Sequence, residues 1–175
     1  MSVLFPSLRK RLTRVSVTKA LEAAVAYGIG DVLSESDTPA AGTAWTFAAI
    51  ASVDGGTGYI VKAHVISETT AIVPRLTLFL FSALPTCELD DNAANTALLH
   101  ADLISYVGKI DFPAMEDLGT GDSEALATPG TYGNLPLAFQ CAAGADDLYG
   151  VLVTRDAFTQ TAIDDMTVRL TAENY

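Results

Sequence analysis

Two histidines, three pairs of adjacent aspartates and two cysteines are the residues of this chain that we consider first for metal binding or catalysis. His64 lies in an extended apolar segment and His100 in a segment of near-helical spacing, and neither has a cysteine or carboxylate at zinc-ligand spacing. The pairs Asp90-Asp91, Asp146-Asp147 and Asp164-Asp165 lack the alternating acids and the glycine of a calcium loop. The sequence therefore predicts no metal and no cofactor, hydrogen-bonded or exposed histidines, and solvated turns at the acidic pairs.

Motifs for nucleophilic catalysis and nucleotide binding are also missing from the sequence. It contains no nucleophile elbow, no phosphate-binding glycine loop and no cysteine–histidine pair. Gly28-Ile29-Gly30-Asp31 matches only part of a dinucleotide-binding motif, and we interpret it as a turn before Val32-Leu33. We therefore expect that the chain is not an enzyme. Cys87 and Cys141 are expected to be free, buried thiols in a reducing compartment. A disulfide formed between them at a late stage is the alternative, since each cysteine lies at the end of an extended segment.

Short alternating segments, each ended by turn residues, make up most of the chain and must position any functional surface. Such a pattern is typical of an antiparallel sandwich or barrel. Strands are predicted over Val15–Val17, Trp45–Ala51, Tyr59–Ile66, Leu76–Phe81, Tyr106–Phe112, Leu135–Cys141, Leu148–Thr154 and Met166–Ala172. Because 175 residues can bury one substantial core, we predict a single all-β domain, an antiparallel, jelly-roll-like β-sandwich with at most one short helix.

The two-residue period of a strand assigns the faces of these segments. Alternate residues are predicted to share an inward face in three segments: Met166, Val168, Leu170 and Ala172; Trp45, Phe47, Ala49 and Ala51; and Tyr59, Val61, Ala63 and Val65. Leu76–Phe81 and Leu148–Val153 are apolar on both faces, so each is a central strand or turns one face towards a partner. The predicted core includes Trp45, Leu78, Leu80, Phe139, Val151 and Leu170.

Three connections are predicted from their composition. Asp54-Gly55-Gly56-Thr57-Gly58 is interpreted as a hairpin loop, because glycine supplies the positive φ angles that such loops need. Near-helical spacing of apolar residues over Asn92–Ser105 predicts the short helix. The polar, glycine-containing segment Glu116–Thr128 is predicted to be a long exposed loop.

Charge is distributed unevenly along the chain. The net charge is −11, yet the first 19 residues contain no acid and five of the ten basic residues: Arg9, Lys10, Arg11, Arg14 and Lys19. The acidic remainder repels phosphate backbones, so no nucleic-acid partner is expected. The basic segment is either a solvated end or an extended arm that docks on an acidic neighbour. We therefore divide the chain into a basic N-terminal arm, residues 1–19, and a sandwich domain, residues 20–175.

Hydropathy and the N-terminal residues indicate in which compartment the protein is expected to be found. Half of the residues are apolar, but the longest uncharged stretch, 125–145, contains Pro129, Pro136 and several glycines, so it is not predicted to span a membrane. Arg9-Lys10-Arg11 precedes any long apolar segment, which is the reverse of a secretory signal. We expect no membrane association, and a protein made in the cytosol that is used there or assembled there before release.

The order of several strand-and-turn motifs resembles the head decoration (cement) proteins of tailed bacteriophages. The matching segments are Thr13–Val17, Ala26–Leu33, Trp45–Phe47, Asp54–Ile60, Pro74–Leu80, Asp91–Ala94, Val107–Phe112 and Leu148–Val153. The likeness spans most of the chain. It implies a jelly-roll-like sandwich that binds the outer capsid lattice, without catalytic residues.

The sequence and this resemblance lead us to expect a structural virion protein that binds the outside of a phage capsid and stabilises the shell by bridging capsid subunits. The expected partners are the major capsid protein and other copies of the chain, as a dimer or trimer, contacted through Arg9, Lys10, Arg11, Arg14 and Lys19. The expected location is the capsid surface of the virion, after assembly in the host cytoplasm. The alternative is a carbohydrate- or receptor-binding module of a phage head or tail fibre, which needs exposed aromatic side chains; the candidates are Trp45, Tyr132 and Tyr149.

Overall fold

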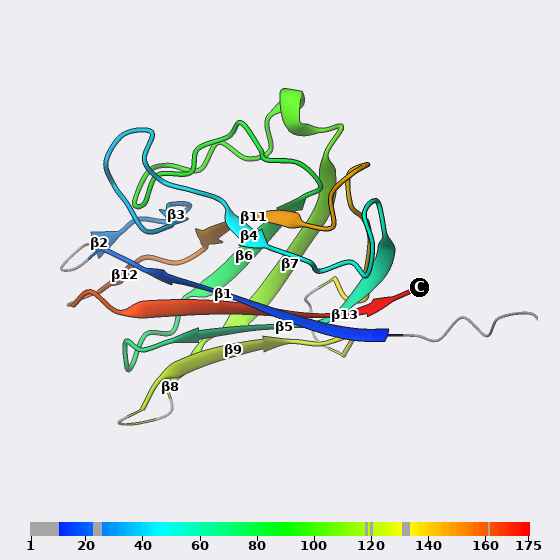
Figure 1. The fold of residues 1–175 in the computed structure, drawn as a ribbon. Coiled ribbons are helices and arrows are strands. Elements are labelled where there is room, and N and C mark those ends of the chain that lie inside the picture. The colour runs from blue at the N-terminus through cyan, green and yellow to red at the C-terminus, as the bar shows by residue number, and fades with distance from the viewer. Residues whose placement is uncertain (1–10, 23–25, 118, 120, 131–133, 161) are drawn as a thin grey trace, which may run out of the picture.

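Two packed antiparallel sheets and a small two-stranded ribbon make up the fold (Figure 1). The structure is a computed structural model, and it describes all residues except 1–10, 23–25, 118, 120, 131–133 and 161. The six-stranded sheet has the order β1-β13-β5-β9-β8, with β10 paired to β5. The five-stranded sheet has the order β3-β11-β6-β7, with β4 paired to β11. The predicted all-β sandwich is therefore confirmed.

The strands agree closely with the apolar segments of the sequence. In the six-stranded sheet they are β1 (Arg11–Ala20), β13 (Asp165–Asn174), β5 (Thr57–Ser67), β9 (Ser123–Ala127), β8 (Glu116–Asp117) and β10 (Leu137–Gln140). In the five-stranded sheet they are β3 (Val32–Leu33), β11 (Leu148–Thr154), β6 (Arg75–Phe81), β7 (Tyr106–Ala114) and β4 (Trp45–Phe47). The ribbon pairs β12 (Phe158–Thr159) with β2 (Ala26–Tyr27), and the 3-10 helix η1 (His100–Asp102) is the one helical element that the described part of the chain contains.

The strands form four antiparallel pairs, each of which lies inside the previous one along the sequence, and this is the topology of a jelly roll. The first long strand, β1, pairs with the last, β13. Inside that pair, β3 and β4 pair with β11, β5 pairs with β9, and the innermost β6 pairs with β7. The outermost and third pairs lie in one sheet and the other two in the second sheet. Each sheet therefore presents one apolar face to the other, and a single main core forms between them.

The central strands of the five-stranded sheet are buried on both faces, as their composition predicts. Leu78 and Leu80 of β6 are fully buried in the main core, where Trp45, Phe139 and Leu170 also lie. The opposite face of the same sheet carries a second apolar cluster that includes Phe81, Val151 and Val153. Residues 83–105 supply the cover for that face, through side chains such as Leu89 and Leu99. All six core residues named from the sequence are therefore buried.

This covering role explains why the helix predicted over Asn92–Ser105 is almost absent. The segment forms only η1, because it spreads across the sheet as an irregular cover instead of presenting one helical stripe. It is held by side-chain hydrogen bonds; for example, buried Asp102 accepts hydrogen bonds from the N–H and the hydroxyl of Thr86, each at 2.9 Å.

A β-bulge in β5 corrects the predicted face of that strand. On the partner strand β13, Thr171 pairs with Lys62 whereas Ala172 pairs with Ile60, so Val61 is an extra residue. The extra residue reverses the alternation: Ile60 is buried on the core side, and so are Ala63 and Val65 beyond the bulge. Tyr59, predicted to face inward, is 42% exposed. The prediction for Tyr59 and Val61 was wrong because a one-residue insertion shifts a period of two.

Two further sequence expectations are corrected by the pairing. The segment Glu116–Thr128 is not one exposed loop: it contains β8 and β9, and Ser123, Ala125 and Ala127 are buried against β5. The small residues of β9 gave it too weak an apolar pattern to be recognised. The loop around residues 54–58 is not a hairpin, because β4 pairs with β11 and β5 lies in the other sheet.

The segment predicted as one strand over Trp45–Ala51 is shorter in the structure. β4 ends at Phe47, and Ala49, predicted to face inward, adopts a φ of 52° and is exposed. Asp147 accepts a hydrogen bond from the Ala49 N–H at 2.9 Å, which holds this turn against the end of β11.

Candidate functional site

The basic residues predicted to contact partners fall into three different environments. Arg9 and Lys10 lie outside the described residues. Arg11 and Arg14 are exposed on β1. Lys19, on the same strand, is buried.

The predicted boundary between arm and sandwich falls inside β1. All ten residues of this strand pair with β13, from Arg11 opposite Asn174 to Ala20 opposite Asp165, without an irregularity in the register. Residues 11–19 are therefore part of the six-stranded sheet and not of a separate arm. The ladder can form because Val15 and Val17 pack against the main core, which gives the strand an inward apolar face.

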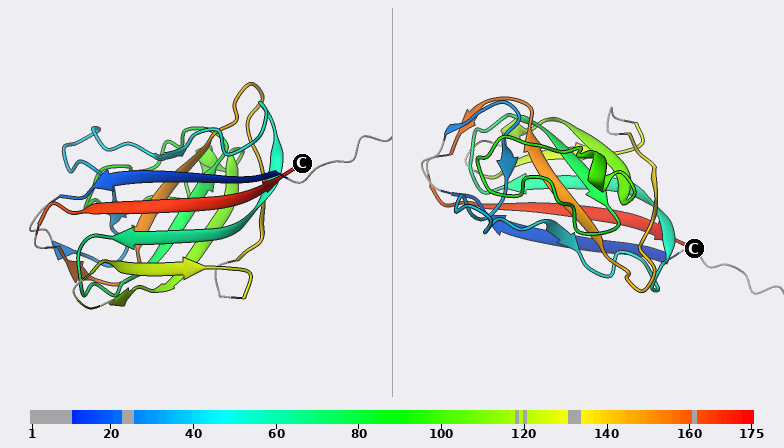
Figure 2. Two further views of the ribbon diagram at one scale, coloured as in Figure 1. Left: turned by 60° about the horizontal axis from the view of Figure 1, so that its bottom comes forward. Right: turned by 90° about the horizontal axis from the view of Figure 1, so that it is seen from above.

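The strands β1, β13 and β5 are neighbours in the six-stranded sheet (Figure 2, left), and the outer face of this sheet carries cations from all three. Arg14 of β1 and Lys62 of β5 stand in one row on either side of Thr171 of β13. In the next row, Arg169 of β13 stands between Ser16 and His64. Because neighbouring strands lie about 4.8 Å apart, these side chains project within roughly 10 Å of one another. We call Arg14, Lys62 and Arg169 the basic face.

Internal ion pairs do not neutralise the basic face. Among the residues that the structure describes, none of its three cations lies within ion-pair distance of a carboxylate. Arg169 donates a hydrogen bond to the Ser16 hydroxyl at 2.9 Å. Two cations elsewhere are matched by acids: Arg75 pairs with Asp156 at 2.7 Å and Lys109 with Asp111 at 2.9 Å. A protein of net charge −11 therefore keeps unmatched positive charge on this face.

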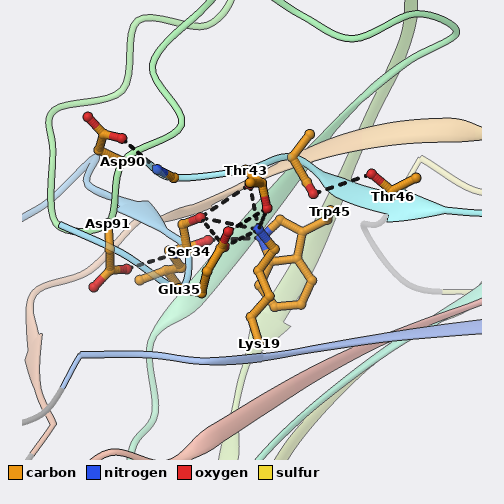
Figure 3. Close-up of polar contacts among 11 residues, drawn as sticks. Lys19, Ser34, Glu35, Thr43, Trp45, Thr46, Asp90 and Asp91 are labelled. Carbon is orange, nitrogen blue, oxygen red and sulfur yellow. Dashed lines mark hydrogen bonds and ion pairs between the residues drawn. The ribbon is translucent and has the colours of Figure 1, made fainter. Parts of the chain in front are cut away.

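Buried Lys19 fixes the far end of β1 to the segment that leads into β4 (Figure 3). Its ammonium group forms an ion pair with Glu35 and donates to the hydroxyl of Ser34 at 3.2 Å and to that of Thr43 at 2.9 Å. It also donates to the Thr43 carbonyl and lies 5.5 Å from the centroid of the Trp45 ring. Lys19 is therefore an internal fastening of the fold, and the expectation that it contacts a partner was wrong.

A signal for this outcome was present in the sequence. Val15, Val17 and Lys19 alternate, so the two-residue period places Lys19 on the inward face of β1. What the period does not reveal is the acid that neutralises it, since Glu35 comes from another element. Burial raises the pKa of Glu35, but the hydrogen bonds from Lys19, Thr43 and Ser34 outweigh it and lower that pKa to about 2. For Lys19, burial lowers the pKa and the Glu35 carboxylate opposes this shift.

One of the three acidic pairs, Asp90-Asp91, is structural and is not a solvated turn. Asp91 is 2% exposed and accepts hydrogen bonds from the Tyr27 hydroxyl and the Ser34 N–H, both at 2.7 Å. Asp90 accepts from the N–H groups of Ala40 and Gly42 at 2.7 and 2.8 Å. These carboxylates fix the long connection between β3 and β4, and the expectation of solvated acids was wrong for this pair.

The remaining candidates of the sequence lie apart from one another. His64 forms a hydrogen bond with Glu124 at 2.6 Å, and His100 is exposed in η1. Cys87 and Cys141 are free and buried, in the second cluster and the main core respectively, and burial raises the pKa of each thiol to about 11. Within the described ranges, three or more metal-ligating side chains nowhere gather as a metal site would require.

Of the three aromatic residues named from the sequence for a carbohydrate- or receptor-binding surface, the two that the structure describes are not exposed on a common surface. Trp45 is 1% exposed and donates its indole N–H to the Leu33 carbonyl at 2.8 Å. Tyr149 is half-buried in β11, and Tyr132 lies outside the described residues. In the described part of the chain, no helix is both long and apolar enough for a membrane crossing.

Comparisons with known proteins give little similarity. No protein-family model matches the sequence, and no curated protein matches it significantly. Among solved structures, the chain is similar to one from the cyanophage Pam1 capsid asymmetric unit, with 13% sequence identity and a TM-score of 0.37. The alignment covers 99% of this chain and 91% of that chain. At this score, no residue or role is transferred from that protein to this one.

Proposed function

We propose that this chain is a structural virion protein that binds the outside of a bacteriophage capsid and stabilises the shell by bridging capsid subunits. The observation that carries the proposal is the basic face, three unmatched cations on the outer side of one sheet of an acidic sandwich. The resemblance of the strand-and-turn motifs to head decoration proteins supports the same role. The proposed location is the capsid surface, after assembly in the host cytoplasm.

The geometry suits docking on a broad acidic surface. Main-chain ladders between β1, β13 and β5 hold the backbone of Arg14, Lys62 and Arg169 in place, so binding requires little further ordering of the backbone. Complementary charge guides the encounter and fixes the orientation of the sandwich, while contact area supplies the rest of the binding energy. A sandwich that spans a boundary between two capsid subunits adds buried area there and thereby opposes the pressure of packaged DNA.

The proposed partners are the major capsid protein and other copies of this chain, as a dimer or trimer. Arg9, Lys10 and Arg11 lie three to five residues before Arg14 in the sequence, so they are proposed to extend the basic face towards a neighbouring subunit. A second contact made after the body has docked gains from a high effective concentration. Light scattering of the purified protein measures the oligomeric state.

The test is binding to native capsids stripped of this protein, with charge-matched variants. Arg14→Glu combined with Lys62→Glu should lower occupancy at least tenfold, and raising the salt concentration should weaken wild-type binding. The control is Arg155→Glu, compared with Arg14→Glu alone: each single change alters the net charge by the same amount, and Arg155 is an exposed residue directly after β11 of the five-stranded sheet, outside the ion pairs of the described residues. Equal occupancy for Arg14→Glu and Arg155→Glu would refute the role of the basic face. Cryo-EM of the native particle shows whether this protein lies on the head, on the tail or on neither.

A further inference from the structure

β1 is a long sheet edge whose outer side is not paired with any of the described strands. It stands at the end of the strand order, and among the described strands β13 is its one neighbour in the six-stranded sheet (Figure 2, left). Over ten residues it contains no proline, and its pairing with β13 shows no bulge. Proteins usually shorten, bend or cover an edge of this kind, because its main-chain groups accept another strand.

The register shows which main-chain groups face the open side. Just beyond β1, the Leu21 N–H donates to the Asp164 carbonyl at 3.1 Å, which continues the pairing of Ala20 with Asp165. In an antiparallel ladder, alternate residues direct both main-chain groups to the same side. Odd-numbered residues therefore bond to β13. The N–H and C=O groups that face away from the sheet belong to Leu12, Arg14, Ser16, Thr18 and Ala20.

A groove continues this edge towards β4. It has a volume of about 420 Å³ and is lined by residues of β1 that include Val17 and Thr18, and across from them by Glu35, Thr43 and Thr46. Its interior charge is balanced, because Lys19 and Glu35 pair there. A strand laid along β1 therefore meets a built recess for its side chains beside the main-chain groups.

Charge decides which kind of strand fits. Arg11 and Arg14 are exposed on β1 itself, and Arg169 stands on the next strand. A second copy of β1 laid parallel would bring these arginines opposite their own like charges, whereas an acidic segment would meet opposite charge along the N-terminal half of the edge.

We infer that β1 is the docking site for an extended acidic segment of a partner protein, which adds to the six-stranded sheet as an antiparallel or parallel strand. This inference rests on the proposed function in one respect only: the proposed function identifies the partner that supplies the acidic strand as a capsid subunit. The main-chain groups of the even-numbered residues give affinity, and the arginines near the N-terminal end of β1 select for acidic side chains.

Hydrogen exchange observed by NMR tests the edge directly. The probe is an eight-residue peptide that alternates glutamate with threonine and valine, and its control replaces glutamate with lysine. The acidic peptide should slow exchange at the amides of Leu12, Arg14, Ser16 and Thr18 at least tenfold and leave the odd-numbered amides unchanged. Equal protection by the lysine peptide, or no protection by the acidic one, overturns the inference.

A proline variant tests the same edge on capsids. Ser16→Pro removes one outward N–H and the hydroxyl that Arg169 contacts, whereas Ser16→Ala removes the hydroxyl alone. Ser16→Pro should lower capsid occupancy at least tenfold relative to Ser16→Ala. If Ser16→Pro does not fold, Leu12→Pro against Leu12→Ala replaces the pair, because Leu12 is 62% exposed.

The outcomes separate the two proposals. If Ser16→Pro binds capsids as well as Ser16→Ala does, the strand addition is overturned and the proposed function is unaffected. Absence of capsid binding by the wild-type protein overturns the proposed function, while the peptide experiment still decides the edge.

Discussion

The buried ion pair between Lys19 and Glu35 predicts unequal losses of stability when one or the other residue is replaced. The Lys19 side chain is 6% exposed and that of Glu35 is 32% exposed. Glu35→Gln leaves a buried ammonium group without its counter-charge, so we expect a loss of about 3 kcal/mol of unfolding free energy. This value is the lower end of the range for breaking a buried pair, because Glu35 is partly solvated.

The reverse substitution should cost less. Lys19→Met keeps an unbranched apolar stem beside Trp45 and leaves Glu35 with the Ser34 and Thr43 hydroxyls as donors, and with access to water. We expect a loss of about 1 kcal/mol, the size of an ordinary hydrogen bond. The double variant, which has neither charge, should lose less than Glu35→Gln alone.

Urea unfolding at neutral pH measures all three free energies, and an unchanged m-value shows that the compared states are the same. A larger loss for Lys19→Met than for Glu35→Gln would refute the reasoning, because it would mean that the buried ammonium group does not need its carboxylate. Equal losses below about 0.5 kcal/mol would refute it too, since surface pairs behave in this way.

Three further predictions follow from burial and pKa. Leu78→Ala or Leu80→Ala should each lower the unfolding free energy by about 2–5 kcal/mol in the same urea experiment, because both side chains are fully buried in the main core; near-neutral midpoints would contradict this. Because the folded protein lowers the Glu35 pKa from its ordinary value of 4.5 to about 2, the stabilisation is complete above pH 4.5 and should be lost as the pH falls towards 2. Glu35→Gln should show a shallower decline over that interval, and equal slopes would rule out this origin. Cys87 and Cys141 should react with a thiol reagent at pH 8 at least a hundredfold more slowly in the native protein than in urea, since burial raises the pKa of both to about 11; rapid native labelling would contradict it.

The sequence by itself determined the architecture and most of the core. Alternation with a period of two encodes which side of a strand faces inward, and this local property placed Leu78, Leu80 and Leu170 correctly. Segments that are apolar on both faces identified β6 and β11 as central strands, because only strands covered on both sides can bury such a composition.

Only the tertiary structure decided which residues meet. The bulge at Val61 reverses a face without any local signal, and β9 is a strand because β5 offers it a ladder. Likewise, the basic face exists because β1, β13 and β5 are neighbours, although more than a hundred residues separate Arg14 from Arg169 along the chain. The ion pair that neutralises buried Lys19 also depends on a distant segment, because its counter-charge, Glu35, comes from another element. Spacing along a strand fixes the direction of a side chain, but its partner depends on pairing between distant segments.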